Sequence, residues 1–177
     1  ANLSGKPSPT TWQAVFEDLS GRINCILQGT ETEIGLESTV LDCTSEIPLV
    51  LRSGAITLEQ LQKIEPKTRL YKMSEIEMPK SPGLKHRHYS PRAKVILISN
   101  FKFQISNKRA FIGLNAPRER FDLIKVCKSI EDYAHSVFAF FRQCDHENIE
   151  TIYCETVEEK GIGLALMDRL KRASQTD

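Results

Sequence analysis

The sequence predicts an α/β protein in two parts, and three observations support this. After Pro91, apolar runs typical of buried strands alternate with helical segments, as in a small Rossmann-like α/β domain with a mostly parallel sheet. Before Ser81, short strands and helices follow a loop rich in proline and small polar residues. Between the two, the segment Ser81–Pro91 is basic, contains no acid, and carries prolines that favour an extended connector.

The composition is that of a globular protein and excludes several classes. Of 177 residues, 40% are hydrophobic and 27% charged, and the net charge of +1 argues against a broad nucleic-acid-binding face. No apolar run is long enough to cross a bilayer, and no signal peptide is apparent. The five scattered cysteines, four of them in apolar contexts, lack the spacing of a zinc site. We therefore expect a cytoplasmic, reduced protein with no membrane partner and no metal cluster.

The first ten residues form a loop that leads into a helix. Thr10 and Gln13 fit a capping box, and Gly21 is a typical stop. Such a helix start offers N–H groups to an anion, although helix capping alone also explains its hydroxyl groups. The helix has one predicted apolar face, made of Trp12, Val15, Phe16 and Leu19.

Strands and a second helix follow in the first part. Arg52 lies at a strand end beside a turn, where a guanidinium can bind phosphate through two hydrogen bonds; an ordinary surface arginine is the alternative. Thr57 and Gln60 form a capping box for a helix that ends before Pro66, and an exposed connector follows over 65–80. The predicted strands are Ile23–Leu27, Glu37–Asp42 and Pro48–Arg52.

The second part alternates strands and helices. The long helix begins after Ser129 as its cap, and Gly161-Ile162-Gly163 fits a plain turn better than a phosphate loop. The predicted strands are Lys94–Ser99, Ala110–Leu114, Phe121–Val126 and Thr151–Glu155, and the helices are Ile130–Cys144 and Gly163–Ala173. These patterns divide the chain into residues 1–64, a linker over 65–93, and a domain over 94–177.

Several separated segments together resemble one family, the YrdC/Sua5 proteins of the two-domain Sua5 type. Residues 1–10 (ANLSGKPSPT) resemble their Ser-Ala-Asn-x-Ser-Gly-x-Pro-Ser-Pro-Thr loop, and residues 35–40 (GLESTV) their Gly-x-Glu-Ser-Thr-Val strand. Residues 51–56 (LRSGAI) are similar to a Leu-Arg-Pro-Gly-x-Ile turn. Residues 81–91 (SPGLKHRHYSP) resemble the Sua5 linker, and residues 159–170 resemble the end of the Sua5 domain. Residues 1–64 would then be the C-terminal part of a YrdC-like α/β domain.

The resemblance implies an L-threonylcarbamoyladenylate synthase. Such an enzyme converts L-threonine, bicarbonate and ATP, with Mg²⁺, into threonylcarbamoyl-AMP and pyrophosphate. The product supplies the tRNA threonylcarbamoyl-transfer machinery. By the same resemblance Ser38 would contact threonine, and no catalytic residue is assigned. The residues that would contact ATP are Asn2, Thr10 and Arg52, together with Arg87, His88 and Tyr89 of a linker that folds over the site.

The resemblance begins within the first motif, at Ala1, and the N-terminal half of the YrdC-like domain has no counterpart in the sequence. We therefore expect these 177 residues alone to be inactive. The alternative function is a non-catalytic RNA-binding or regulatory module whose basic linker contacts tRNA phosphates. Steep loss of RNA affinity with salt would indicate that module, whereas ATP binding that depends on Arg52 would indicate the enzyme.

Overall fold

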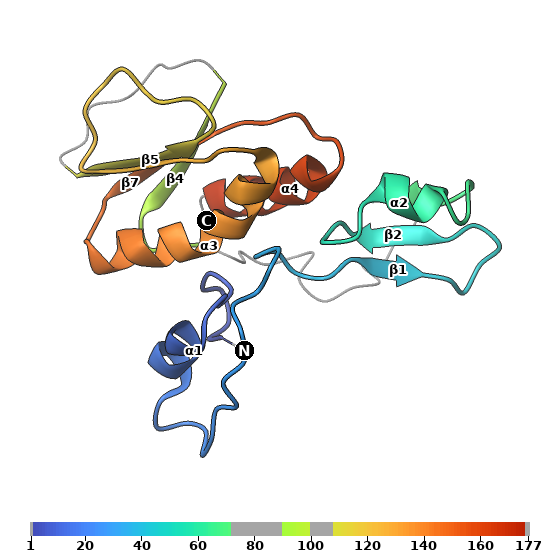
Figure 1. Cartoon of the computed structure of the whole chain (residues 1–177), viewed down its shortest axis with the longest axis horizontal. Helices are drawn as coiled ribbons and strands as arrows, with labels where there is room; N and C mark the ends of the chain where they lie inside the picture. Colours follow the sequence, from blue (N-terminus) through green and yellow to red (C-terminus); the bar gives the residue numbers. More distant parts are fainter. Residues whose placement is uncertain (1, 72–89, 100–107, 176–177) are drawn as a thin grey trace.

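The described residues form two separate β-sheets (Figure 1). The computed structural model describes residues 2–71, 90–99 and 108–175. One sheet has three strands in the order β1-β2-β3, and the other has four in the order β4-β7-β5-β6. The strands and helices of the second sheet lie together at one end of the molecule, whereas β1, β2 and α2 project from them.

The four-stranded sheet confirms the predicted parallel α/β domain. All of its neighbouring strands run parallel. Each predicted strand is present within one or two residues of its expected bounds. The strands are β4 (Lys94–Ile98), β5 (Arg109–Gly113), β6 (Leu123–Val126) and β7 (Thr151–Glu155).

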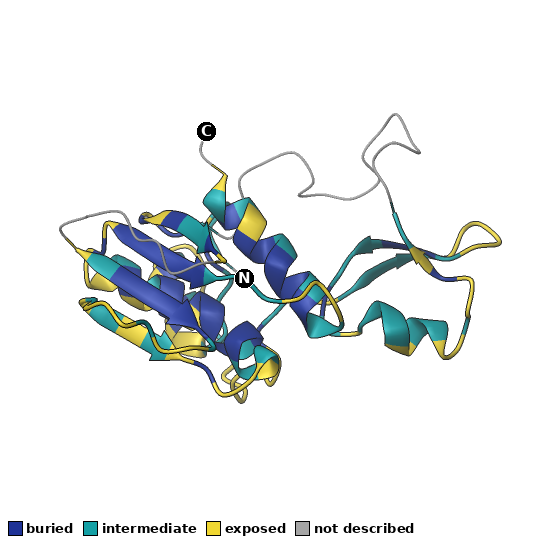
Figure 2. Cartoon of the chain, turned by 90° about the horizontal axis from the view of Figure 1, so that it is seen from above, coloured by how far each residue is buried: buried dark blue, intermediate teal, exposed yellow. Residues whose placement is uncertain are grey.

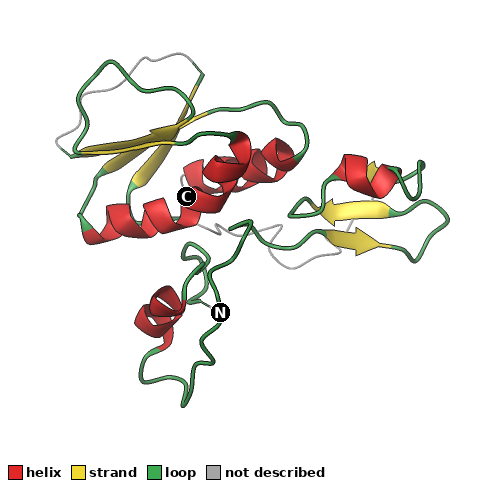
Figure 3. Cartoon of the chain, viewed as in Figure 1, coloured by secondary structure: helices red, strands yellow, loops and turns green. Residues whose placement is uncertain are grey.

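Two helices cover one face of this sheet and form the main core (Figure 3). In α3 (Ile130–His146), the hydroxyl of Ser129 accepts the N–H of Asp132, so the predicted cap is confirmed. The second helix, α4 (Ile162–Ser174), follows β7. Figure 2 shows that buried residues concentrate in these two helices and the sheet. The predicted inward residues of α3 are buried: Tyr133, Ala134, Val137, Phe140, Phe141 and Cys144.

The first part of the chain is less buried. It contains α1 (Trp12–Leu19), the antiparallel pair β1 (Val40–Asp42) and β2 (Leu49–Arg52), and then α2 (Leu58–Gln62). The capping box of Thr57 and Gln60 is confirmed, because each side chain bonds the other's backbone N–H. Strand β3 (Arg69–Leu70) pairs parallel to β2 within the range that we had predicted as exposed connector.

Besides the exposed connector, three predictions for this part were wrong. Ile23–Leu27 is not a strand, because no described segment pairs with it, and Leu27 is 93% exposed. Helix α1 is capped by Thr11 rather than Thr10. Its buried residues are Ala14 and Asp18, whereas Trp12 and Phe16 of the predicted apolar face are 39% and 53% exposed.

Within the part of the chain that the structure describes, none of the helices combines the length and apolarity that a bilayer crossing requires. All five cysteines are free thiols. Three of them are buried, namely Cys127, Cys144 and Cys154. The sequence contexts had suggested four buried cysteines. Burial is the main reason why the pKa of Cys127 rises to about 11 and that of Cys144 to about 12.

Candidate active site

The loop over residues 2–10 folds back on itself around an asparagine. The side-chain amide of Asn2 donates to the carbonyls of Leu3 (2.9 Å) and Lys6 (3.1 Å). The N–H of Lys6 also donates to the carbonyl of Leu3, at 3.2 Å. Gly5 has a φ of 86°, in the left-handed region that glycine adopts most readily. Asn2 therefore helps to set the shape of the loop that, by resemblance, contacts ATP.

Ser38 and Arg52 lie in contact. The guanidinium of Arg52 donates to the carbonyl of Ser38 through Nε (3.1 Å) and Nη2 (3.0 Å), and Nη2 also lies 3.3 Å from the Ser38 hydroxyl oxygen. The antiparallel pairing of β1 with β2 produces this contact, since Val40 is opposite Arg52. The structure thus brings a cation to the residue that the resemblance places against threonine.

A glycine turn holds the backbone at this point. A Cβ atom added to Gly54 would collide with the backbone of Glu37 and Ser38. The N–H of Ala55 also donates to the carbonyl of Glu37, at 3.2 Å. The turn after β2 is therefore packed directly against the Glu37-Ser38 segment, which explains why the motif needs glycine there.

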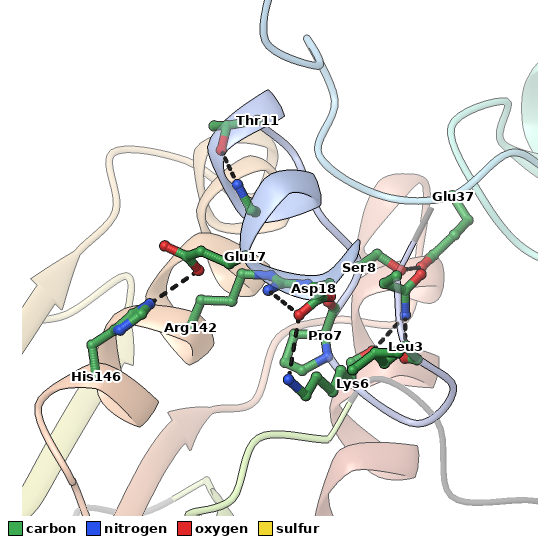
Figure 4. A network of polar contacts seen from close by, with 12 residues as sticks. Leu3, Lys6, Pro7, Ser8, Thr11, Glu17, Asp18, Glu37, Arg142 and His146 are labelled. Carbon is green, nitrogen blue, oxygen red and sulfur yellow. Dashed lines mark hydrogen bonds and ion pairs between the residues drawn. The ribbon is translucent and has the colours of Figure 1, made fainter. Parts of the chain in front are cut away.

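A glutamate joins the loop to the segment that precedes β1. The hydroxyl of Ser8 donates to Oε1 of Glu37 at 2.5 Å, as Figure 4 shows. Because Glu37 directly precedes Ser38, the loop and the Ser38–Arg52 contact form one connected arrangement. The other carboxylate oxygen of Glu37, Oε2, accepts Nε of Arg169 from α4 at 2.8 Å.

A second arginine holds the loop from helix α3. Nη2 of Arg142 donates to the carbonyl of Pro7 and to Oδ2 of Asp18, both at 2.6 Å (Figure 4). Lys6 lies 3.3 Å from Oδ1 of the same aspartate. Burial of Asp18 raises its pKa, but the hydrogen bonds and charges of Arg142 and Lys6 outweigh that effect, so its pKa is lowered. Asp18 is therefore held as a buried carboxylate.

The end of the linker reaches the same loop. The N–H of Ser90 donates to the carbonyl of Gly5 at 3.0 Å. Arg87, His88 and Tyr89, the linker residues predicted to contact ATP, lie outside the described residues, and their roles stay predictions. A cavity of about 550 Å³ is bounded by the loop, by α1 and α3, and by the end of the linker over 90–92.

The predicted site residues do not all share one cavity. Arg52 lines a different cavity of about 310 Å³, between β2 and α4, and Thr10 lines a third of about 330 Å³ beside α3. The acids around the 550 Å³ cavity are engaged with bases, as in the pair of Glu17 with His146 at 3.2 Å. The arrangement therefore offers a cation at Ser38 and a preformed loop, rather than a single closed pocket.

The Gly161 turn has a structural role, which agrees with the prediction. Its N–H, at the start of α4, donates to Oε1 of Glu59 at 3.2 Å. A carboxylate from α2 thus occupies the position that a phosphate would take in a phosphate loop.

The described residues of the site provide no ready Mg²⁺ ligands. No group of three or more His, Cys, Asp or Glu residues among them is arranged to hold a metal ion. Both carboxylate oxygens of Glu37, the acid next to Ser38, are already engaged. Mg²⁺ commonly binds through substrate phosphates and few protein ligands, so no step is assigned to a protein-bound metal here.

Four residues that organise the site escaped the sequence analysis: Asp18, Glu37, Arg142 and Arg169. Two of them carried a usable signal. Glu37 lies within the Gly-x-Glu-Ser-Thr-Val motif. Arg169 directly precedes the buried Leu170 in α4 and follows Leu166 by three residues, so it lies in the apolar stripe of that helix. A charged residue in such a stripe indicates a buried ion pair.

The fold and site define a two-part α/β protein in which a second domain supports a loop and a segment that holds an arginine against Ser38. The family model for the C-terminal domain of threonylcarbamoyl-AMP synthase matches residues 56–175, and the model described as "Telomere recombination", for Sua5/YciO/YrdC proteins, matches residues 1–54. The chain therefore belongs to the threonylcarbamoyl-AMP synthase family of Sua5 proteins.

Similar proteins agree with this assignment. The threonylcarbamoyl-AMP synthase of Pyrococcus abyssi is 36% identical over 98% of this chain and 56% of its own length. The Bacillus subtilis enzyme of the same name is 35% identical, over 98% of this chain and 55% of its own. The crystal structure of P. abyssi Sua5 complexed with L-threonine has a TM-score of 0.83 and 34% identity, over 98% of this chain and 56% of that one. The chain thus spans about half the length of the relatives it matches.

Proposed function

We propose that this chain forms part of a threonylcarbamoyl-AMP synthase, which makes L-threonylcarbamoyladenylate from L-threonine, bicarbonate and ATP. The observation that carries the proposal is the contact of Arg52 with both the carbonyl and the hydroxyl of Ser38, beside a loop joined to Glu37 through Ser8. A similar protein, P. abyssi Sua5, has been crystallised with L-threonine, which supports an amino-acid site in this family.

The reaction needs positioning and charge neutralisation more than an acid or base. The amine of threonine and bicarbonate form a carbamate with loss of water. A carbamate oxygen then attacks the α-phosphorus of ATP, and the bond from that phosphorus to the bridging oxygen breaks to release pyrophosphate. Negative charge gathers on phosphate oxygens, where a fixed guanidinium such as that of Arg52 is effective. Ser38 would orient the threonine, and Asn2 and Thr10 would bind the nucleotide.

The product is a mixed anhydride that water can hydrolyse. A linker that folds over the site would protect it, and the bond from Ser90 to Gly5 brings the end of that linker to the loop. The product would then pass to the machinery that transfers the threonylcarbamoyl group to tRNA. Mg²⁺ would enter with the phosphates of ATP.

We further propose that these 177 residues need the additional catalytic-domain sequence that their relatives carry. Large apolar side chains on and after α1 are exposed where a catalytic domain would bury them. These residues are Trp12, Phe16, Ile23 and Leu27.

The test is pyrophosphate release from ATP, measured for this chain and for the chain extended upstream by the remaining half of the catalytic domain. Release that requires threonine and bicarbonate is expected only from the extended form. Within it, Arg52→Met should reduce kcat/KM for ATP about tenfold or more, since a charged hydrogen bond is worth ~1.5–3 kcal/mol. Arg69→Met, an exposed arginine of the same sheet, is the control.

A folded, extended protein that releases no pyrophosphate would contradict the synthase. RNA binding that weakens steeply with salt would then identify the non-catalytic alternative.

A further inference from the structure

Two arginines of the second domain hold adjacent residues of the loop. Arg142 on α3 donates to the carbonyl of Pro7 at 2.6 Å. Arg169 on α4 donates to Glu37 at 2.8 Å, and Glu37 accepts the hydroxyl of Ser8 at 2.5 Å. Pro7 and Ser8 lie between Asn2 and Thr10, so any displacement of this pair moves the whole segment that the resemblance places against ATP.

Arg169 is fully buried, and Arg142 is mostly shielded from solvent. The side chain of Arg169 is 0% exposed and that of Arg142 is 12% exposed. Burying a guanidinium is unfavourable unless its partners have good geometry, and replacement by an apolar side chain of similar size is often neutral or stabilising. The stability of the core alone therefore does not explain why charged residues occupy these positions. A need to orient particular partners does explain it.

The contacts also need the arginine shape. Both terminal nitrogens of Arg142 donate to Asp18, and one of them, Nη2, also donates to the carbonyl of Pro7. Arg142 therefore connects α3 both to helix α1 and to the loop. A planar fork with several donors can satisfy these partners at once, and a lysine ammonium cannot match that geometry.

We propose that Arg142 and Arg169 are positioning residues, through which the second domain sets the Pro7-Ser8 segment for ATP and the Glu37-Ser38 segment for threonine. This rests on the proposed synthase function. Of these two segments, Arg142 holds only Pro7-Ser8, whereas Arg169 acts through Glu37 on both.

The two arginines therefore differ in their expected kinetic effects. In the extended protein, Arg142→Met should raise the KM for ATP about tenfold, the effect of losing ~1.4 kcal/mol, and leave the KM for threonine within about twofold. Arg169→Met should raise both KM values, because Glu37 adjoins Ser38. Arg169→Lys, which keeps the charge beside Glu37, should fall between Arg169→Met and the unaltered protein.

Two control variants lie on the same helices. Glu131→Gln changes an exposed residue of α3, and Ser174→Ala removes a hydroxyl of α4 that donates to the carbonyl of Lys171. Both should leave the two KM values unchanged. If the arginine variants instead lower kcat with unchanged KM values, they have only reduced the folded fraction, and the positioning role is wrong.

Hydrogen exchange on the 177-residue chain tests the same idea without activity. Arg142→Met should speed amide exchange across residues 3–8 about tenfold, while β5 (Arg109–Gly113) stays as protected as before. Unchanged exchange in the loop would overturn the proposal whatever the kinetics. If the unaltered extended protein makes no product, the synthase function is refuted. Amide hydrogen exchange would still decide whether the arginines hold the loop.

Discussion

The ion pair between Asp18 and Arg142 should be worth far more than an exposed pair that joins the same two helices. Its partners are 2% and 12% exposed, and the closest atoms lie 2.6 Å apart. Removing one member of a buried pair costs about 3–5 kcal/mol, because the other charge stays buried without its partner. In Arg142→Met, Lys6 still lies near Asp18 at 3.3 Å, so we expect about 3 kcal/mol.

The double variant gives the sharper number. Asp18→Leu with Arg142→Met replaces both charges by apolar groups. It leaves the Pro7 carbonyl without its donor, a loss of about 1 kcal/mol, and releases the Lys6 ammonium, which is 52% exposed and can be solvated instead. Each single variant should therefore lower the free energy of unfolding more than the double variant does, and the coupling energy should be at least about 2 kcal/mol. Glu17 and His146, also on α1 and α3 but 47% and 63% exposed, should show a coupling below about 1 kcal/mol.

The assay is urea unfolding of the 177-residue chain, followed by tryptophan fluorescence. Trp12 is the single tryptophan and lies on α1, so its emission reports whether that helix stays docked. Circular dichroism, dominated by α3 and α4, reports the second domain separately. A coupling energy for Asp18 and Arg142 no larger than that of the exposed pair would refute the reasoning.

Three further predictions follow from burial and backbone geometry. The pKa of Asp18 in the folded protein is lowered from 3.8, so on acidification Asp18 is protonated in the unfolded protein before it is protonated in the folded one. The melting temperature of the unaltered protein should therefore exceed that of Asp18→Asn fully at neutral pH, and the difference should disappear as the pH falls below 3.8. Gly35→Ala should destabilise by about 2 kcal/mol or more, because φ is +74° and the new Cβ would lie 2.5 Å from a backbone oxygen of α3, whereas Gly21→Ala, with the same φ and open space, should cost about 1 kcal/mol in a thermal melt. A thiol reagent such as DTNB should modify two cysteines in the native protein and five after denaturation, and fast reaction of a third would contradict the burial; the two reactive residues should be Cys25 and Cys43.

The second domain could be predicted almost completely from the sequence because its signals are local. The apolar run that begins at Lys94 and the 3.6-residue periodicity after Ser129 each identify an element without reference to the rest of the chain. The same holds for the capping box at Thr57, where both partners lie within three residues.

The failures arose where distant residues decide the outcome. The run Ile23–Leu27 has the composition of a strand, but a strand forms only with a partner, and no described segment provides one. In α1 the apolar spacing favoured an inward Trp12, whereas Arg142, 124 residues beyond Asp18, draws the aspartate inward instead.

The candidate site shows the same division. The contact of Ser38 with Arg52 follows from a hairpin between nearby strands, and the quoted motifs flagged both residues. The support from Arg169 to Glu37 spans 132 residues and two domains, so a local pattern could indicate a buried ion pair at Arg169 but not its partner. Motifs identify what touches a substrate more readily than what holds those residues in place.

The central claim is tested most directly by looking for the product itself. The chain extended upstream would be incubated with ATP, L-threonine and isotopically labelled bicarbonate, and the mixture analysed by mass spectrometry. The account predicts a species containing AMP, threonine and one labelled carbon, which disappears when threonine is omitted and falls about tenfold or more with Arg52→Met. A folded extended protein that yields no such species, or yields it equally with Arg52→Met, would contradict the account.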